Sequence, residues 1–271
     1  MSVMKPSILF ILTCIFSLYT VQAQDSLVNQ DIKVNSQLWL DYNFAHTVFN
    51  AKKLQTQVSF RKIFPEAFNR FVVMSALEIP HKKSLSFLNL EKTVVQSFHL
   101  GTGLFYTQNF DAKDNLEFRL FQGFKFDIPT IKSITLNNYV RLEERFQNNF
   151  NNSGWTSGFR LRYRLSTILK YNKHLTDFVD GFYIPLSAEV FFNLKKSDRY
   201  NDLIRLEPGL GYKLKNNWKF EVYLIFNETK NNTATNNSSS DFILRLRVFD
   251  GNIVSASKKN QITKPKDLHN N

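Results

Sequence analysis

Hydrophobic and polar residues alternate along most of the chain, and the segment Gly154–Leu165 shows this pattern most clearly. Aromatic and aliphatic residues occupy the odd positions from Phe159 to Leu165, whereas arginines occupy positions 160, 162 and 164. Successive side chains of a β-strand point to opposite faces, so this segment would have one apolar face and one arginine face. A helix would spread the same arginines around its circumference and break any apolar stripe. The period of two therefore predicts a strand.

The same alternation recurs along the chain and predicts eleven strands separated by turn-like polar segments. These strands are Gln37–Ala45, Lys53–Arg61, Phe68–Ile79, Val94–Asn109, Asn115–Phe126, Ile131–Phe146, Gly154–Leu165, Gly181–Leu194, Leu203–Leu214, Trp218–Thr229 and Ser239–Phe249. Ser84–Leu90 is a short candidate for a twelfth strand. No segment has a convincing helical period, and no linker divides the chain into domains.

Many of the predicted strands have ten or more residues. Strands of soluble proteins usually have about five or six residues, whereas a strand that crosses a membrane needs about 9–11. We therefore predict an all-β fold, an antiparallel transmembrane β-barrel of 10–12 strands. Twelve is favoured because single-chain bacterial barrels have even strand numbers.

Two other architectures compete with this prediction, a helical membrane protein and a soluble β-protein. A helical membrane protein is excluded, because no run of about 18 apolar residues follows the N-terminal segment. A closed barrel is then the remaining way to cross a bilayer without unpaired backbone edges. The alternative is a soluble periplasmic β-sandwich or lipocalin-like barrel that turns its apolar face inward and binds an apolar ligand.

The first residues have the order of a secretory signal. Lys5 lies in a short leading segment, Ile8–Thr20 is an apolar run, and Val21–Ala23 offers a small-residue cleavage site. We expect residues 1–23 to be a signal peptide, residues 24–250 a β-barrel domain and residues 251–271 a polar, disordered tail. The one cysteine, Cys14, would leave with the signal, which excludes disulfide scaffolds and thiol catalysis. The predicted location is the bacterial outer membrane, with the periplasm as the alternative.

The composition and the net charge of the chain restrict the classes of partner that it can bind. Aromatic residues make up 15% of the 271 residues, with 27 phenylalanines, and this excess must lie in a core or against lipid. The formal net charge is +12. The basic residues are spread over alternating faces of an exported chain, so we expect no nucleic-acid partner. The predicted partners are outer-membrane lipid and lipopolysaccharide, the barrel-insertion machinery and, if the interior binds one, a small ligand.

The polar faces of the predicted strands carry arginine and glutamate in an order that suits pairing across strands. The candidate residues are Arg119, Arg141, Glu143, Arg145, Arg160, Arg162, Arg164, Glu189, Arg205, Glu207, Arg245 and Arg247, and Glu221 lies on the same kind of face. We expect these side chains to fill the lumen with an ionic ladder, since an unpaired charge there would cost several kcal/mol. Because the arginines outnumber the acids, an anion- or substrate-binding lumen is the alternative.

Catalytic motifs are sparse in the sequence. The five histidines lack a metal-ligand spacing, and the GxSxG, Walker and dinucleotide motifs are absent. We therefore expect no enzymatic activity, no metal and no cofactor. An outer-membrane hydrolase acting on lipid or peptide is the alternative, with His46 and Asp41, or His99, as its candidate residues.

Several segments together resemble one protein family. They are Trp39-Leu-Asp-Tyr42, Arg141-Leu-Glu-Glu-Arg-Phe146, Arg160-Leu-Arg-Tyr-Arg-Leu165, Glu189-Val-Phe-Phe-Asn-Leu194 and Gly209-Leu-Gly-Tyr-Lys-Leu214. These residues are similar to the DUF2490 family over about positions 37–249. The resemblance implies an exported outer-membrane β-barrel of Bacteroidetes and other Gram-negative bacteria, and it supplies no catalytic residues. The function predicted is an outer-membrane barrel with a structural role, a small-ligand or lipid-binding role, or a narrow pore.

Overall fold

The computed structural model describes residues 33–48, 52–64, 68–84, 94–110, 112–131, 134–150, 154–170, 181–194, 202–230 and 239–250. The predicted signal peptide and the predicted polar tail lie outside these residues. So does the short strand candidate Ser84–Leu90, apart from its first residue.

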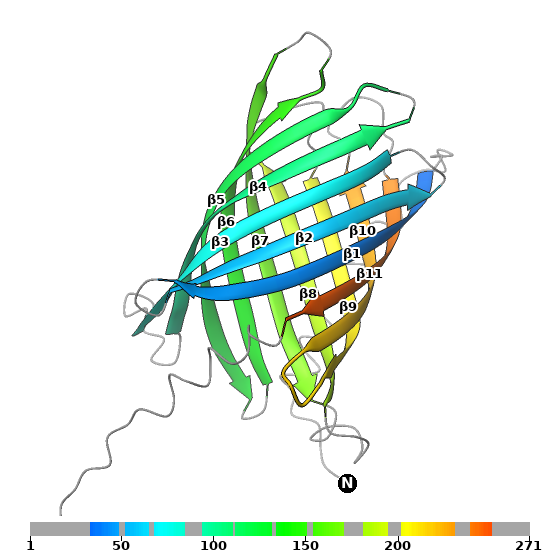
Figure 1. The fold of residues 1–271 in the computed structure, drawn as a ribbon. Helices are drawn as coiled ribbons and strands as arrows, with labels where there is room; N and C mark the ends of the chain where they lie inside the picture. Colours follow the sequence, from blue (N-terminus) through cyan, green and yellow to red (C-terminus); the bar gives the residue numbers. More distant parts are fainter. Residues whose placement is uncertain are drawn as a thin grey trace, which may run out of the picture. The chain divides into compact units, whose positions relative to one another are not determined.

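The described residues form eleven strands that close into a barrel in chain order (Figure 1). The strands are β1 (Lys33–Val48), β2 (Lys52–Phe64), β3 (Phe68–Ser84), β4 (Val94–Asn109), β5 (Asn115–Ile131), β6 (Ile134–Asn148), β7 (Thr156–Lys170), β8 (Phe182–Asn193), β9 (Asp202–Lys213), β10 (Lys219–Lys230) and β11 (Ser239–Phe249). Each strand matches one predicted segment, and the prediction of an all-β barrel is confirmed. Among the described residues, no helix is long and apolar enough to span a bilayer.

The barrel closes through one parallel seam. Ten of the eleven strand pairs are antiparallel, whereas β1 and β11 run parallel from Lys33↔Ser239 to Asn43↔Phe249. Strands linked in sequence alternate in direction, so an odd number of them makes the first and last parallel. The predicted range of 10–12 strands holds, but the favoured count of twelve is one too high, because it assumed a fully antiparallel ring. A parallel ladder is only slightly less stable per residue, so this closure costs little.

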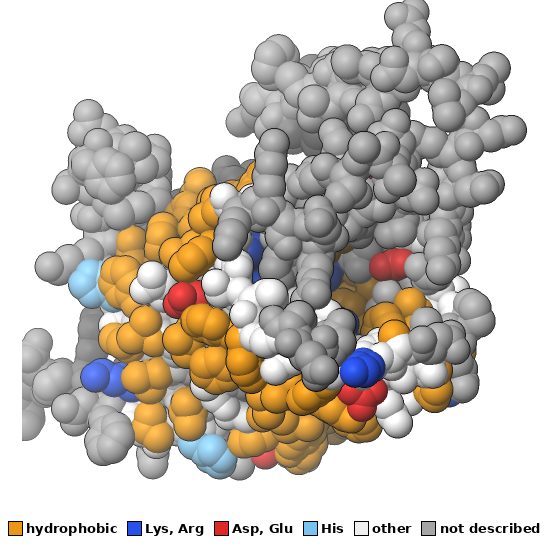
Figure 2. Space-filling model, turned by 90° about the horizontal axis from the view of Figure 1, so that it is seen from above, with side chains coloured by type: hydrophobic (Ala, Val, Ile, Leu, Met, Phe, Trp, Pro, Cys, Tyr) orange, Lys and Arg blue, Asp and Glu red, His pale blue; other side chains and the backbone are white. Residues whose placement is uncertain are grey.

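The wall of the barrel is apolar outside and largely polar inside, as β10 illustrates. Leu224 and Phe226 are 58% and 42% exposed, whereas Glu221 and Asn227 on the other face of the strand are 5% and 7% exposed. Across the described residues, thirty-one large hydrophobic side chains are exposed. They make up much of the outer wall that is visible in the space-filling view (Figure 2). The alternation that predicted the strands therefore places charge in the interior and hydrocarbon on the surface.

Glycines on the inner face let aromatic rings lie against the backbone of the neighbouring strand. Gly101 on β4 pairs with Phe121 on β5, and Gly211 on β9 pairs with Tyr183 on β8. A Cβ atom added at either glycine would overlap the paired ring. Because glycine in a strand interior otherwise weakens the strand, its place here follows from this close approach.

Candidate functional site

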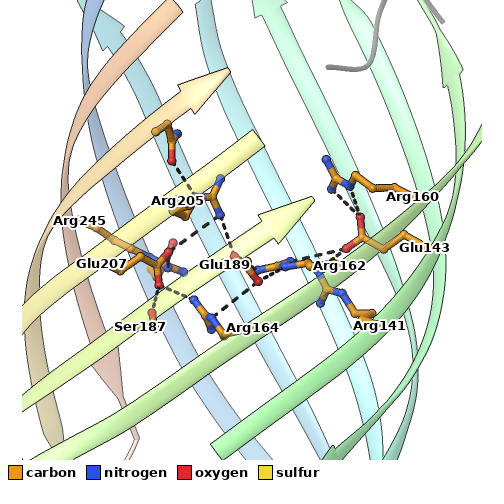
Figure 3. A network of polar contacts seen from close by, with 12 residues as sticks. Arg141, Glu143, Arg160, Arg162, Arg164, Ser187, Glu189, Arg205, Glu207 and Arg245 are labelled. Carbon is orange, nitrogen blue, oxygen red and sulfur yellow. Dashed lines mark hydrogen bonds and ion pairs between the residues drawn. The ribbon is translucent and has the colours of Figure 1, made fainter. Parts of the chain in front are cut away.

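The twelve charged residues predicted to face the lumen all come from the strands β5 to β11. They are Arg119 on β5; Arg141, Glu143 and Arg145 on β6; Arg160, Arg162 and Arg164 on β7; Glu189 on β8; Arg205 and Glu207 on β9; and Arg245 and Arg247 on β11. Every one of them takes part in an ion pair inside the barrel. The central members point toward one another from neighbouring strands of the wall (Figure 3).

Glu143 has the most arginine neighbours of the carboxylates in this network. Its side chain is fully buried and accepts hydrogen bonds from Arg141 and from Nε of Arg160, the latter at 2.9 Å. Nη1 of Arg162 lies 3.6 Å from its Oε1, and Nη1 of Arg119 lies 3.9 Å from its Oε2. One carboxylate therefore balances guanidinium groups from three strands, β5, β6 and β7.

Glu189 continues the network on the next strand. It is 1% exposed and accepts two hydrogen bonds from Arg162, one of them from Nη2 to Oε2 at 2.7 Å. Nη1 of Arg205 lies 3.4 Å from Oε2, and Nε of Arg164 lies 3.7 Å from Oε1. Arg162 thus joins Glu189 to Glu143, and the chain of charges runs on around the barrel wall.

Glu207 carries the network to the last strand. It accepts a hydrogen bond from Arg164 and a 2.8 Å hydrogen bond from the hydroxyl of Ser187. Nη1 of Arg245 on β11 lies 3.5 Å from its Oε1. Because each carboxylate shares an arginine with the next, loss of one member would leave its neighbours with uncompensated charge.

Asp41 on β1 closes the network across the parallel seam. It accepts a 2.6 Å hydrogen bond from Nε of Arg245 and another from the hydroxyl of Ser59 on β2. Nε of Arg247 lies 3.8 Å from the same carboxylate. Side-chain hydrogen bonds and ion pairs therefore connect β1 with β2 and, across the parallel ladder, with β11.

Two further carboxylates lie on the inner face. Glu117 accepts hydrogen bonds from Nε and Nη2 of Arg119 at 2.6 and 3.0 Å, and from Nη2 of Arg145 at 3.0 Å. Sequence reasoning did not name Asp41 or Glu117 as members of the ladder. The signal was present, since both residues alternate with apolar neighbours on their strands.

Glu221 is the other carboxylate, and it binds phenols as well as an arginine. It accepts hydrogen bonds from the hydroxyls of Tyr183 at 2.7 Å and Tyr223 at 2.8 Å, while Nη1 of Arg247 lies 3.4 Å away. Neutral hydroxyl groups therefore supply hydrogen bonds to this carboxylate, which has fewer arginine neighbours.

Aromatic rings on the inner face separate the arginines. The ring of Trp39 has the guanidinium carbon of Arg61 at 4.0 Å from its centroid, and those of Arg205 and Arg245 at 5.2 and 5.6 Å. Phe191 has three guanidinium groups at 4.9 Å. Cation–π contacts of this kind stabilise arginines when water is excluded, so a high density of arginine is tolerated here.

Two cavities lie inside the barrel. The first, which we call the arginine cavity, has a volume of about 460 Å³ and is lined by eleven arginines and one carboxylate, Asp241, among the described residues. The second, of about 540 Å³, is lined mainly by amide, hydroxyl and aromatic side chains together with Lys125, Lys219 and three arginines. Residues common to both cavities are Gln57, Met74, Tyr139, Arg141, Arg164 and Arg247, so the two adjoin at this level.

The residues proposed for a hydrolase are not brought together as that chemistry requires. Asp41 is buried inside, whereas His46, five residues later, is exposed on the outer face. His99 is buried, and its Nε2 lies 2.9 Å from the hydroxyl of Ser97 and 3.8 Å from Oε1 of Glu78. Both contacts are to the same ring nitrogen, whereas a relay needs the serine and the acid on opposite nitrogens.

Within the described ranges, no three His, Cys, Asp or Glu side chains gather closely enough to hold a metal ion.

Comparison with curated proteins and with solved structures gave no match. The family model DUF2490, described as a protein of unknown function, matches residues 36–239, which is more than half of the chain. The barrel with its arginine-lined interior is therefore a member of the DUF2490 family.

Proposed function

We propose that this protein is a bacterial outer-membrane β-barrel whose wall is embedded in lipid and whose interior is narrowed by charged side chains. Within that membrane it has a structural role, or it binds or passes a small ligand. The observation that carries the proposal is the polarity of the wall, which is apolar outside and charged inside.

The energetics of this polarity favour lipid over water around the barrel. Fully burying one Leu or Phe side chain stabilises a protein by about 1.5–3 kcal/mol. Thirty-one such large hydrophobic side chains are exposed among the described residues. Moving these side chains from water into hydrocarbon is therefore favourable by on the order of tens of kcal/mol.

Strand length supports the same proposal. The shortest strand, β11, has 11 residues, and β3 and β5 have 17. A tilted strand of about 9–11 residues is enough to cross the hydrocarbon core. Every strand is therefore long enough to span a bilayer, and the closed ring leaves no unpaired edge in lipid.

The charged interior favours binding of a small ligand, or its passage through a narrow channel, over a wide pore. Ion pairs join charged side chains of strands that are adjacent or two apart around the wall. The two cavities adjoin at a level that carries Arg141, Arg164 and Arg247. The partners expected of such a barrel are outer-membrane lipid, lipopolysaccharide and the machinery that inserts it.

Fractionation followed by gel electrophoresis with and without heating tests the proposal. We expect the full chain, produced in a Gram-negative host, to require detergent for extraction from the outer membrane. Unheated protein should migrate as a compact species, and heating should shift it to slower migration. Release by osmotic shock without detergent, with no heat-dependent shift, would overturn the membrane assignment and favour a soluble periplasmic barrel.

A further inference from the structure

The inner wall contains three pairs of arginines that lie directly opposite one another on neighbouring strands. Like charges in this arrangement destabilise a sheet unless something compensates them. The pairs are Arg61↔Arg70 between β2 and β3, Arg119↔Arg145 between β5 and β6, and Arg141↔Arg162 between β6 and β7.

Two of these pairs share a carboxylate. Glu117 accepts hydrogen bonds from both Arg119 and Arg145. Glu143 likewise bonds to Arg141 and lies 3.6 Å from Arg162. The structure thus has a repeated solution for opposed arginines, in which one buried oxyanion lies between two guanidinium groups.

The third pair has no such carboxylate among the described residues. Arg61 stacks on Trp39, and its buried Nε has no hydrogen-bond partner. Arg70 donates from Nε to the hydroxyl of Thr107 at 2.8 Å, which is a neutral acceptor. The charge of Asp41 acts on Arg61, but this carboxylate is already hydrogen-bonded to Arg245 and Ser59. The charge of Glu117 likewise acts on Arg70, but Glu117 is already hydrogen-bonded to Arg119 and Arg145.

Both guanidinium groups line the arginine cavity, where Asp241 is the one acidic residue in the described lining. Arg61 also lies in the field of Arg245, Arg70 and Arg205, which adds positive potential that the carboxylate of Asp41 opposes. A cavity of about 460 Å³ has the size of a small-molecule site. The positive charge of the lining, the unpartnered Nε of Arg61 and the size of the cavity together favour an anionic ligand.

We propose that Arg61 and Arg70 bind a small phosphate-bearing anion in the arginine cavity, where its oxygens take the place that Glu117 and Glu143 occupy between the other two arginine pairs. Two guanidinium groups offer planar pairs of N–H donors that match phosphate oxygens. The phosphate is either free in solution or part of a lipid headgroup. This proposal rests on the proposed function and identifies a class of ligand for the interior of the barrel. Binding of that ligand can be measured in detergent without any assumption about the membrane.

The test uses the full chain folded in detergent, with its heat-dependent gel shift confirming a closed barrel before each titration. Inorganic phosphate and pyrophosphate are the probes, and sodium chloride at equal ionic strength is the control. The readout is the fluorescence of Trp39 in a Trp155→Phe/Trp218→Phe background, together with the midpoint of thermal unfolding. We expect saturable binding of pyrophosphate and a rise in the midpoint that chloride does not produce.

Two variants separate an anion site from a structural role. Arg61→Gln and Arg70→Gln should each weaken pyrophosphate binding by about tenfold or more. Without phosphate their unfolding midpoints should be unchanged or higher, because an opposed positive charge is removed. Lys113→Gln removes the same charge from an exposed turn and should leave binding unchanged.

Two other outcomes would overturn the proposal, and a third would identify the source of the phosphate. If Arg61→Gln lowers the ligand-free midpoint and leaves the phosphate response intact, Arg61 is a structural member of the network. If phosphate and chloride act equally on a barrel that shows the heat shift, the cavity is not an oxyanion site, although the barrel proposal stands. Binding of anionic lipid vesicles without any response to free pyrophosphate would assign the site to a lipid headgroup.

Discussion

Replacing Glu143 by glutamine measures how much the charged interior contributes to the free energy of unfolding. Glu143 is fully buried and has four arginines within 3.9 Å. The substitution keeps the shape of the side chain but removes the charge, and its amide N–H groups would face guanidinium donors. Removing one partner of a buried ionic group costs about 3–5 kcal/mol, because the remaining charges are left uncompensated. We therefore expect Glu143→Gln to lower the free energy of unfolding by about 3–5 kcal/mol, or about 10²–10⁴ in the equilibrium constant.

Urea unfolding in detergent micelles, followed by tryptophan fluorescence, measures this change. Urea is chosen because it is uncharged and does not screen ion pairs. Glu144 provides a matched control, since it is the next residue of β6 and its side chain points to the opposite face of the wall. Glu144→Gln should change stability by no more than about 0.5 kcal/mol. Equal losses for the two variants would refute the reasoning that the interior network holds the barrel together.

Three further substitutions test separate parts of the account. Arg162→Ala removes the link between Glu143 and Glu189 and should cost about 3–5 kcal/mol; unchanged urea stability and unchanged single-channel conductance would contradict the ionic ladder. Gly101→Ala places a methyl group against the ring of Phe121 and should cost about 1–3 kcal/mol by overpacking, and an unaltered urea midpoint would argue against that close approach. Leu224→Arg should cost about 2–4 kcal/mol in lipid vesicles if β10 faces hydrocarbon, whereas a negligible loss would place this face in water.

The period of two was sufficient to locate the strands and to sort their residues into two faces. The predicted bounds of β4 and β11 agree with the structure, because both strands alternate up to a clear polar break. Even residues that sequence reasoning left out of the ladder, such as Asp41 and Glu117, occur on the polar faces that it identified. Local patterning is a property of each strand, so one sequence can reveal it.

Contacts between strands could not be predicted in the same way, because they depend on register. The direct opposition of Arg61 and Arg70 is set by the pairing of β2 with β3, and the shared carboxylates of the other two arginine pairs are set by the pairing of β5 to β7. The parallel seam depends on the total number of strands that close the ring. These are long-range properties of the closed sheet, and a shift of one residue would turn every side chain to the other face.

The central claim is that the apolar wall lies in lipid, and spin labelling of β10 tests it most directly. Single cysteines would be introduced in turn from Phe220 to Asn227 in a Cys14→Ser chain, labelled, and reconstituted in lipid vesicles. Collision with oxygen, which concentrates in the bilayer, would be compared with collision with a water-soluble nickel complex. We predict high oxygen and low nickel accessibility at positions 220, 222, 224 and 226, and low accessibility to both at the positions between them. High nickel accessibility at the outward positions would contradict the claim and place this face of the barrel in water.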